Sequence, residues 1–281
     1  TQASFLDLFN GDESKVEKLN TMVTEKMGWD TDKSLSVTGQ TYPRIVDFYI
    51  LSTLAGIAAA IHKFATDVRL LANRGEIEEP FEKNQIGSSA MAYKRNPMRC
   101  ERMCALARFV MNMPQNAAQT AAVQWMERTL DDSANRRLTL PEAFLTLDGV
   151  LDVCINVTDG LIVHEARVTA NLMKEMPFLA TERLMMEAVK HGADRQDAHE
   201  VVRSHAIEVA QKMKSEGIEN DLLERLASEP MFASIDLQSV TNPAEYVGRA
   251  SSQVDGFVQE VVTPIRNSYA EKSAEIEELR V

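Results

Sequence analysis

The sequence predicts an all-α protein in which a long-helix bundle precedes a compact helical domain. Short β-branched runs bounded by turns, which mark strands, are nearly absent from the 281 residues. Apolar residues within 43–74 recur at alternating spacings of three and four, which is the pattern of a heptad seam. From residue 164 onward the helical stretches become shorter and Gly and Pro separate them. We therefore expect two domains, residues 1–163 and 164–281.

The clearest element is a helix over about residues 43–74, which Gly75 ends. At ~1.5 Å per residue it would be roughly 48 Å long. The expected seam consists of Ile50, Leu54, Ile57, Ile61, Phe64, Val68 and Leu71. A helix of this length with such a seam indicates a long bundle shared between subunits.

Proline residues divide the next part of the chain. A helix should begin near Pro97 and break at Pro114, because proline lacks the N–H that a helix interior needs. The stretch 127–137 is polar almost throughout. A further long helix should open at Pro141 and run to about Val163.

The second domain shows helix caps along its length. Gly192 and Gly217 have the positions of C-cap glycines, and Asn242 followed by Pro243 is typical of a helix start. A closing helix is expected to be interrupted at Pro264. The shorter helices before it are expected at about 166–174, 181–191, 194–215 and 220–228.

Composition excludes several classes of partner. The formal net charge of −12 argues against a nucleic-acid surface. No apolar run of ~18 or more residues is present, so we expect no membrane span, and no secretory signal is visible.

Cys100, Cys104 and Cys154 cannot all pair within one chain, which favours reduced thiols and a cytoplasmic location. The start at Thr1 indicates the interior of a longer protein, although processing would give the same start.

The strongest candidate site is the polar segment Gly87–Pro97. Lys94 supplies a positive charge and Asn96 a neutral donor, which together suit a small dicarboxylate. Ser88 or Ser89 has the chemistry of a nucleophile or a base. The alternative is an ordinary polar loop that caps the following helix.

A second candidate lies between residues 128 and 137. Arg128, Ser133, Arg136 and Arg137 place guanidinium and hydroxyl donors close together, and arginine pairs with phosphate oxygens through two parallel hydrogen bonds. The alternative is a solvated turn with local ion pairs.

A third candidate is Gly39–Arg44, just before the long helix. Gln40 and Thr41 either hydrogen-bond a ligand or cap that helix. The histidines provide little evidence for a metal site, since His199 and His205 are six residues apart and lie on different faces of one helix. We expect no metal site.

The segment 87–97 resembles the signature G-S-S-x-M-P-x-K-x-N of the fumarase/aspartase superfamily. Further segments resemble its adenylosuccinate lyase branch: Tyr93, Arg95, Met98–Arg102, Thr38–Tyr42, Gln124–Arg137 and Arg195–Asp197. The resemblance runs along essentially the whole chain. It implies a long-helix bundle of the fumarase/aspartase type.

The resemblance also implies an activity in purine biosynthesis. The reaction would be a β-elimination that releases fumarate from adenylosuccinate, giving AMP, and from SAICAR, giving AICAR. No metal or organic cofactor is implied. The implied assembly is a homotetramer whose active sites each gather residues from three subunits.

Residue roles follow from the same resemblance. Ser88 matches the general base that removes the Cβ proton, and Glu101 matches the carboxylate that orients a catalytic histidine. Lys94 and Asn96 match groups that hold the succinyl carboxylates. The other matched substrate contacts are Gln40, Ser89, Met91 and Arg102, with Arg128, Ser133 and Arg137 at the nucleotide end.

Two departures from the superfamily pattern stand out. Ala92 replaces the proline of the signature, which removes a backbone restraint. None of the five histidines matches the general acid, so the chain resembles roughly the last three-fifths of a subunit. Two rival interpretations remain: an argininosuccinate lyase-like enzyme, and a non-catalytic helical scaffold.

Overall fold

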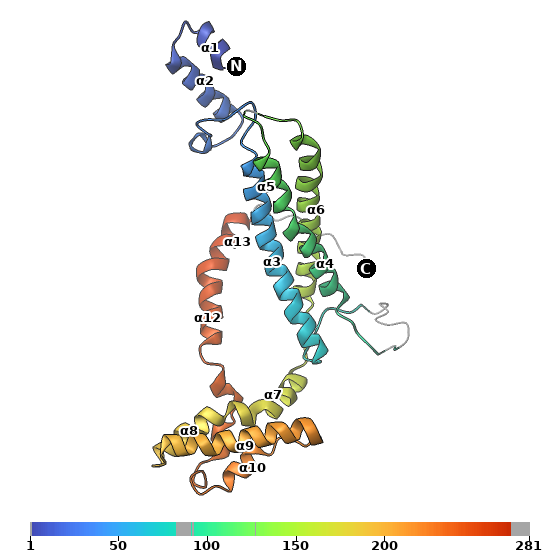
Figure 1. Cartoon of the computed structure of the whole chain (residues 1–281), viewed down its shortest axis with the longest axis vertical. Coiled ribbons are helices and arrows are strands. Elements are labelled where there is room, and N and C mark those ends of the chain that lie inside the picture. The colour runs from blue at the N-terminus through green and yellow to red at the C-terminus, as the bar shows by residue number, and fades with distance from the viewer. Residues whose placement is uncertain (1, 83–90, 92, 127, 271–281) are drawn as a thin grey trace. The chain divides into compact units, whose positions relative to one another are not determined.

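The computed structural model describes residues 2–82, 91, 93–126 and 128–270. The described chain is helical nearly throughout, which confirms the predicted all-α class (Figure 1). It divides into two compact units, residues 1–66 with 99–154 and residues 67–98 with 155–281. The domain division at 163/164 stays a prediction.

The first unit is built around three long or medium helices. Its elements, two of which continue into the second unit, are α1 (Gln2–Leu8), α2 (Glu13–Lys26), η1 (Thr31–Lys33), α3 (Ile45–Asn73), α4 (Met98–Asn112), α5 (Pro114–Ala122) and α6 (Asp132–Asp159). α3 is held against α4 where the Cys104 Sγ lies 3.8 Å from the His62 carbonyl oxygen. α5 and α6 are joined where the Asn135 side-chain amide donates to the Asn116 side-chain oxygen at 3.1 Å.

The long helix α3 confirms the predicted element, but its buried face differs from the predicted seam. The buried residues are Leu51, Leu54, Ala58, Ile61, Ala65 and Val68. Ile50 and Ile57, which the heptad pattern placed in the seam, are 38% and 41% exposed. Ala58 and Ala65, which have short side chains, are both 0% exposed. An outer apolar stripe is therefore left on α3.

By length and composition alone, α3 is also apolar enough to cross a membrane. An 18-residue stretch of it has a mean hydropathy of 1.7. The core helix of a protein bundle passes the same test. Asp47 in the first turn is 1% exposed and pairs with Arg136 of α6, as expected of a helix packed in protein. The absence of a membrane partner stays a prediction.

Helix α6 begins nine residues earlier than the sequence indicates. The prediction that this helix opens at Pro141 was wrong, because α6 starts at Asp132 and runs through Pro141. Proline leaves the Arg137 carbonyl without its usual helical donor. The contacts of Asp132 with Arg44, of Asn135 with α5 and of Arg136 with α3 offset that loss.

The second unit contains shorter helices, and the first four of them correspond to the four ranges that the sequence predicts before the closing helix. The helices are α7 (Glu165–Leu179), α8 (Thr181–Lys190), α9 (Arg195–Glu216), α10 (Leu222–Ala227), α11 (Leu237–Val240), η2 (Pro243–Tyr246), α12 (Ala250–Phe257), η3 (Val258–Val262) and α13 (Thr263–Tyr269). The Asp194 side chain caps α9 by accepting from the backbone N–H groups of Gln196 and Asp197. Gly217 ends the same helix with a φ of 70°, as predicted for a C-cap glycine.

The core of the second unit lies among α8, α9 and α10. The Leu184, Val209, Leu222 and Phe232 side chains are at most 1% exposed. The closing helix is interrupted by the π-helical turn η3, immediately before Pro264 rather than at it. The extra residue in that turn lets the chain continue helically into the proline-bearing first turn of α13.

Two short strands are the only sheet among the described residues. β1 (Ile77–Glu78) pairs antiparallel with β2 (Ile162–Val163), and Glu78 lies opposite Ile162. Gly160, just before β2, has no room for a side chain, because a Cβ there would come within 2.6 Å of Pro80 Cβ. This close approach places Pro80 directly against the residue that precedes β2 by two positions.

Candidate functional site

The signature segment is described from Met91 and from Tyr93 to Pro97, within the second unit. Ser88 and Ser89 lie outside the described residues. The Lys94 backbone N–H donates to the Met91 carbonyl at 3.0 Å and closes a turn. The Lys94 side chain is exposed and Asn96 is half-buried. The two residues predicted to hold carboxylates are therefore close in space and accessible.

Arg95, between these two residues, contacts two residues that precede the segment. Its Nη1 donates to Glu78 Oε2 at 3.0 Å. Its guanidinium carbon also lies 4.9 Å from the centre of the Phe81 ring. The sequence distinguished Arg95 only through the family resemblance and assigned it no role, because a lone arginine in a polar segment has many equivalent uses.

Glu101 and Arg102 lie on α4, whose first residue follows Pro97. Both are exposed, whereas Cys100, Met103 and Cys104 of the same helix are buried. Glu101 is in the first turn, where the positive end of the helix dipole favours a carboxylate. Its exposed position leaves it free to meet a group from outside the first unit.

Gln40 and the residues predicted at the nucleotide end belong to the first unit. Gln40 is exposed in the irregular segment before α3, and Arg137 is exposed on α6. The Ser133 hydroxyl donates to the Leu130 carbonyl at 3.1 Å. Arg128 is half-buried, and its Nε finds no hydrogen-bond acceptor among the described residues. That buried donor is available for an anionic ligand.

A network of charged and aromatic side chains joins these two segments. The Arg44 Nε donates to Asp132 Oδ2 at 2.6 Å, and the two side chains are 7% and 0% exposed. The Tyr42 hydroxyl donates to Asp47 Oδ1 at 2.6 Å. Arg136 donates both to Asp47 and to the Tyr42 oxygen. The network thus ties the Gln40 segment to the first turns of α6.

The electrostatics of the network follow from these contacts. Burial raises the pKa of Tyr42, and the hydrogen bond to Asp47 raises it further. The hydrogen bond to Asp47 raises the pKa of Arg136. The guanidinium carbons of Arg44 and Arg136 lie 4.7 and 5.3 Å from the centre of the Tyr42 ring. The two raised pKa values keep Arg136 charged and Tyr42 neutral near neutral pH.

The sequence identified only part of this arrangement. Asp47 and Asp132 were not predicted site residues, and Arg136 was considered only as a phosphate ligand. The pairs that they form join positions 88 or more residues apart, so no local pattern reveals them. The structure assigns Arg136 to the network and leaves Arg137 exposed, and the prediction for Arg137 stays a prediction.

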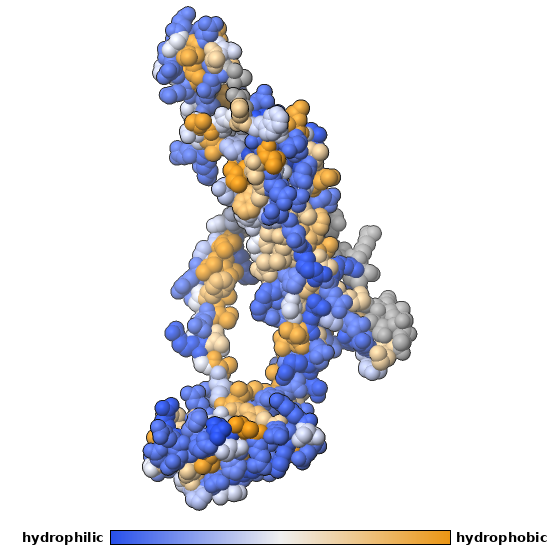
Figure 2. Space-filling view, viewed as in Figure 1, coloured by the Kyte–Doolittle hydropathy of each residue, from blue (hydrophilic) through white to orange (hydrophobic). Residues whose placement is uncertain are grey.

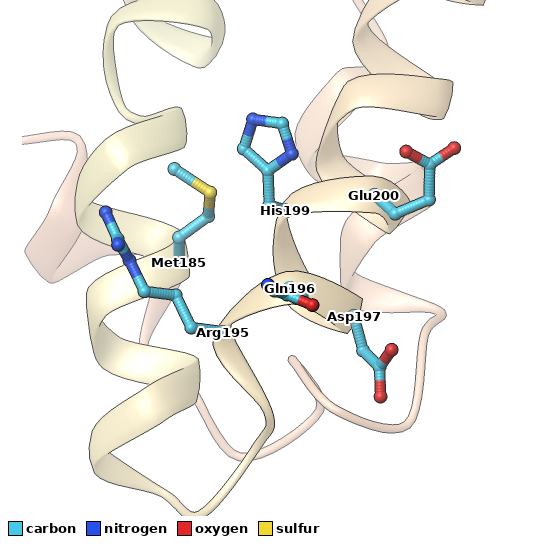
Figure 3. Close-up of a pocket in the computed structure, with 6 residues that line it drawn as sticks. All are labelled: Met185, Arg195, Gln196, Asp197, His199 and Glu200. Atoms are coloured by element: carbon cyan, nitrogen blue, oxygen red, sulfur yellow. The ribbon is translucent and has the colours of Figure 1, made fainter.

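A separate cavity of about 550 Å³ lies at the start of α9. It is lined by Met185, Arg195, Gln196, Asp197, His199 and Glu200 (Figure 3). Figure 3 shows Arg195 and His199 on the side of Met185, while Asp197 and Glu200 point to the other side. Opposite charges alternate along one exposed helical stretch, so the lining favours no single class of ligand.

Two protein families match parts of the chain. The family described as adenylosuccinate lyase C-terminus matches residues 177–257, and the family described as lyase matches residues 14–112. Adenylosuccinate lyase from Schizosaccharomyces pombe is 48% identical over 98% of this chain and 58% of its own length. The enzyme of the same name from Saccharomyces cerevisiae is 52% identical over 93% of this chain and 54% of its own length. The chain thus spans a little over half the length of these relatives.

Solved structures share the fold at lower identity. The 3-carboxy-cis,cis-muconate lactonizing enzyme from Pseudomonas putida is 23% identical, with a TM-score of 0.66 over 84% of this chain and 51% of its own. A fumarate lyase from Mesorhizobium sp. BNC1 is 24% identical, with a TM-score of 0.61 over 76% of this chain and 46% of its own. These likenesses support the helical fold and carry no information on substrate.

Proposed function

Because this chain belongs to the adenylosuccinate lyase family of the fumarase/aspartase superfamily, we propose that it acts in purine biosynthesis as part of an adenylosuccinate lyase. The enzyme would release fumarate from adenylosuccinate, leaving AMP, and from SAICAR, leaving AICAR. The observation that carries the proposal is the joint presence of a carboxylate-binding pair and a nucleotide-binding set. The pair is Lys94 and Asn96, and the set is Arg128, Ser133 and Arg137.

The proposed chemistry needs one base and one acid. Ser88, as an alkoxide, takes the proton from the succinyl carbon, and the electron pair left behind is delocalised onto the neighbouring carboxylate. That electron pair then forms the double bond of fumarate as the carbon–nitrogen bond breaks, and the nitrogen of the leaving nucleotide takes a proton from an acid. Lys94 and Asn96 stabilise the negative charge that builds up on the neighbouring carboxylate. Ser89, Met91 and Arg102 complete the contacts to the succinyl part, and Glu101 orients the catalytic histidine.

The structure of the first unit supports the nucleotide end of this proposal. The network around Tyr42 ties the Gln40 segment to α6, which carries Ser133 and Arg137. Arg128 offers a buried guanidinium N–H with no acceptor among the described residues. A phosphate group would supply that acceptor and balance the charge of the arginines.

We also propose that the acid and part of each active site come from outside this chain, in a homotetramer. None of the five histidines matches the general acid. Apolar faces remain exposed on α3 (Tyr49 61%, Ile57 41%) and on α6 (Leu138 67%, Leu145 66%). Figure 2 shows a further apolar stripe along α12 to α13, which includes Val254, Phe257 and Ile265. Helices that are apolar on several sides are covered in their working state. A cytoplasmic location is part of the same proposal.

A comparison of two substrates tests the proposed function. The assembled enzyme, meaning the oligomer in which this chain's site is complete, should release fumarate from adenylosuccinate and not from argininosuccinate. The phosphate of the first substrate is what Arg128, Ser133 and Arg137 would recognise. Preference for argininosuccinate would support the rival lyase, and release from neither substrate would favour the non-catalytic scaffold.

A further inference from the structure

We propose that Arg95 is a positioning residue that presents Lys94 and Asn96 to the dicarboxylate part of the substrate. The proposal rests on the proposed function, because it concerns how that carboxylate-binding pair is oriented. Arg95 itself does not contact substrate in this account. It acts through its contacts with Glu78 and Phe81, which precede the signature segment in the chain.

The contacts of Arg95 join two stretches of the second unit. The Nη1 donates to Glu78 Oε2 at 3.0 Å, a charge-assisted hydrogen bond. The guanidinium also lies over the Phe81 ring, with its carbon 4.9 Å from the ring centre. A hydrogen bond and a cation–π contact thus hold the Arg95 guanidinium in one position and orientation.

Glu78 is itself held in place. It belongs to β1, where it pairs with Ile162 of β2. The His164 backbone N–H donates to the Glu76 carbonyl at 2.9 Å and extends that pairing. The His164 Nε2 lies 3.5 Å from Glu78 Oε1, so the carboxylate faces Arg95 with one oxygen and His164 with the other. Arg95 is therefore attached to a fixed point of the unit.

Backbone geometry carries the effect from Arg95 to its neighbours. Asn96 precedes Pro97, and a residue before proline is restricted to extended conformations. Asn96 lines a small pocket together with Glu78, Phe81 and Arg95. Lys94 directly precedes Arg95, and its side chain is exposed. Because Arg95 lies between these two residues, its contacts with Glu78 and Phe81 hold the backbone from which both side chains extend.

The ion pair is too exposed to be explained as a main source of stability. The Arg95 and Glu78 side chains are 48% and 27% exposed, and exposed pairs contribute little to folding. Substitution of Arg95 should accordingly leave the chain folded while it disturbs the pair beside it.

Binding of fumarate and of AMP, measured separately on the assembled enzyme, tests this role. Arg95→Met should weaken inhibition by fumarate and lower kcat/KM, each by about 10- to 100-fold, because small misplacements of binding groups have effects of that size. The affinity for AMP should stay unchanged, since the nucleotide-end residues lie in the first unit. Arg95→Lys should be intermediate, because lysine keeps the charge without the planar fork.

Two further variants make the test specific. Arg108→Met, at an exposed arginine of α4, is the matched control and should leave both affinities unchanged. The pair of substitutions Glu78→Arg with Arg95→Glu should recover part of the fumarate affinity by reversing the ion pair. Recovery would exclude a general structural defect.

Unchanged fumarate inhibition in Arg95→Met would overturn the proposal. Equal weakening of fumarate and AMP binding would also overturn it, because that pattern belongs to a general loss of structure. An unmodified enzyme that binds fumarate and AMP but releases no fumarate from adenylosuccinate would instead overturn the proposed function. The fumarate comparison would still decide the role of Arg95 in that case.

Discussion

Ser88→Ala in the assembled enzyme is expected to lower kcat by about 10²- to 10⁴-fold, the range for loss of a positioned general base. In the proposed mechanism, no other group of the signature segment removes the Cβ proton. The binding groups remain, so substrate and AMP should still bind with nearly unchanged affinity. Initial rates of fumarate release, with AMP binding measured by calorimetry, report the two effects separately.

Ser252→Ala provides the matched control for this prediction. Ser252 lies on α12, and its hydroxyl donates only to the nearby Arg249 carbonyl in the described contacts. The control should keep the unmodified rate. Turnover of Ser88→Ala at the unmodified rate would remove Ser88 from the mechanism and leave the base unassigned.

Asp132→Asn is expected to reduce the free energy of unfolding by about 3–5 kcal/mol, the usual cost of removing one partner of a buried ion pair. Asp132 is 0% exposed and holds Arg44, which is itself buried. The substitution leaves the Arg44 guanidinium buried without its counter-charge. Urea unfolding followed by circular dichroism measures the loss.

Two comparisons separate the ion pair from other effects on α6. Glu142→Gln changes an exposed carboxylate on the same helix and should alter the free energy of unfolding by less than ~0.5 kcal/mol. Arg44→Met with Asp132→Leu removes both charges and should recover most of the lost stability. If Asp132→Asn unfolds at the same urea concentration as the unmodified protein, the pair does not stabilise the first unit.

The length and class of the helices could be predicted because periodicity and caps are local properties. The long helix α3 and its end at Gly75 follow from spacing and from one residue that accepts a positive φ, here 73°. The start of α6 could not be predicted in the same way. Pro141 is the strongest local signal for a helix start, but contacts of Asp132 and Arg136 with distant residues determine where the helix begins.

The buried face of α3 was only half predictable. The residues Leu54, Ile61 and Val68 occupy the expected seam, whereas Ala58 and Ala65 are buried in place of Ile57 and Phe64. A heptad pattern predicts burial from the hydrophobicity of each residue. The residues that are buried in α3 also include small ones, which hydrophobicity alone does not identify. Larger apolar residues are left on the outer face, as expected of a helix that contacts partners on more than one side.

The candidate site was predictable as far as its residues share a motif. Lys94 and Asn96 are recognised from the signature. In the structure the Lys94 side chain is exposed and Asn96 is half-buried. Their support by Arg95, Glu78 and Phe81 depends on the β1–β2 pairing, which has no signal in two-residue strands. The roles of the site residues remain predictions.

The central claim is that this chain carries the base and the binding groups of an adenylosuccinate lyase, while the general acid is supplied from outside it. Fumarate release from adenylosuccinate by the isolated 281-residue chain, measured beside the assembled enzyme, tests this claim most directly. The account predicts release by the assembled enzyme and none above background by the isolated chain. Clear turnover by the isolated chain would contradict it, because the acid would then have to lie within these residues.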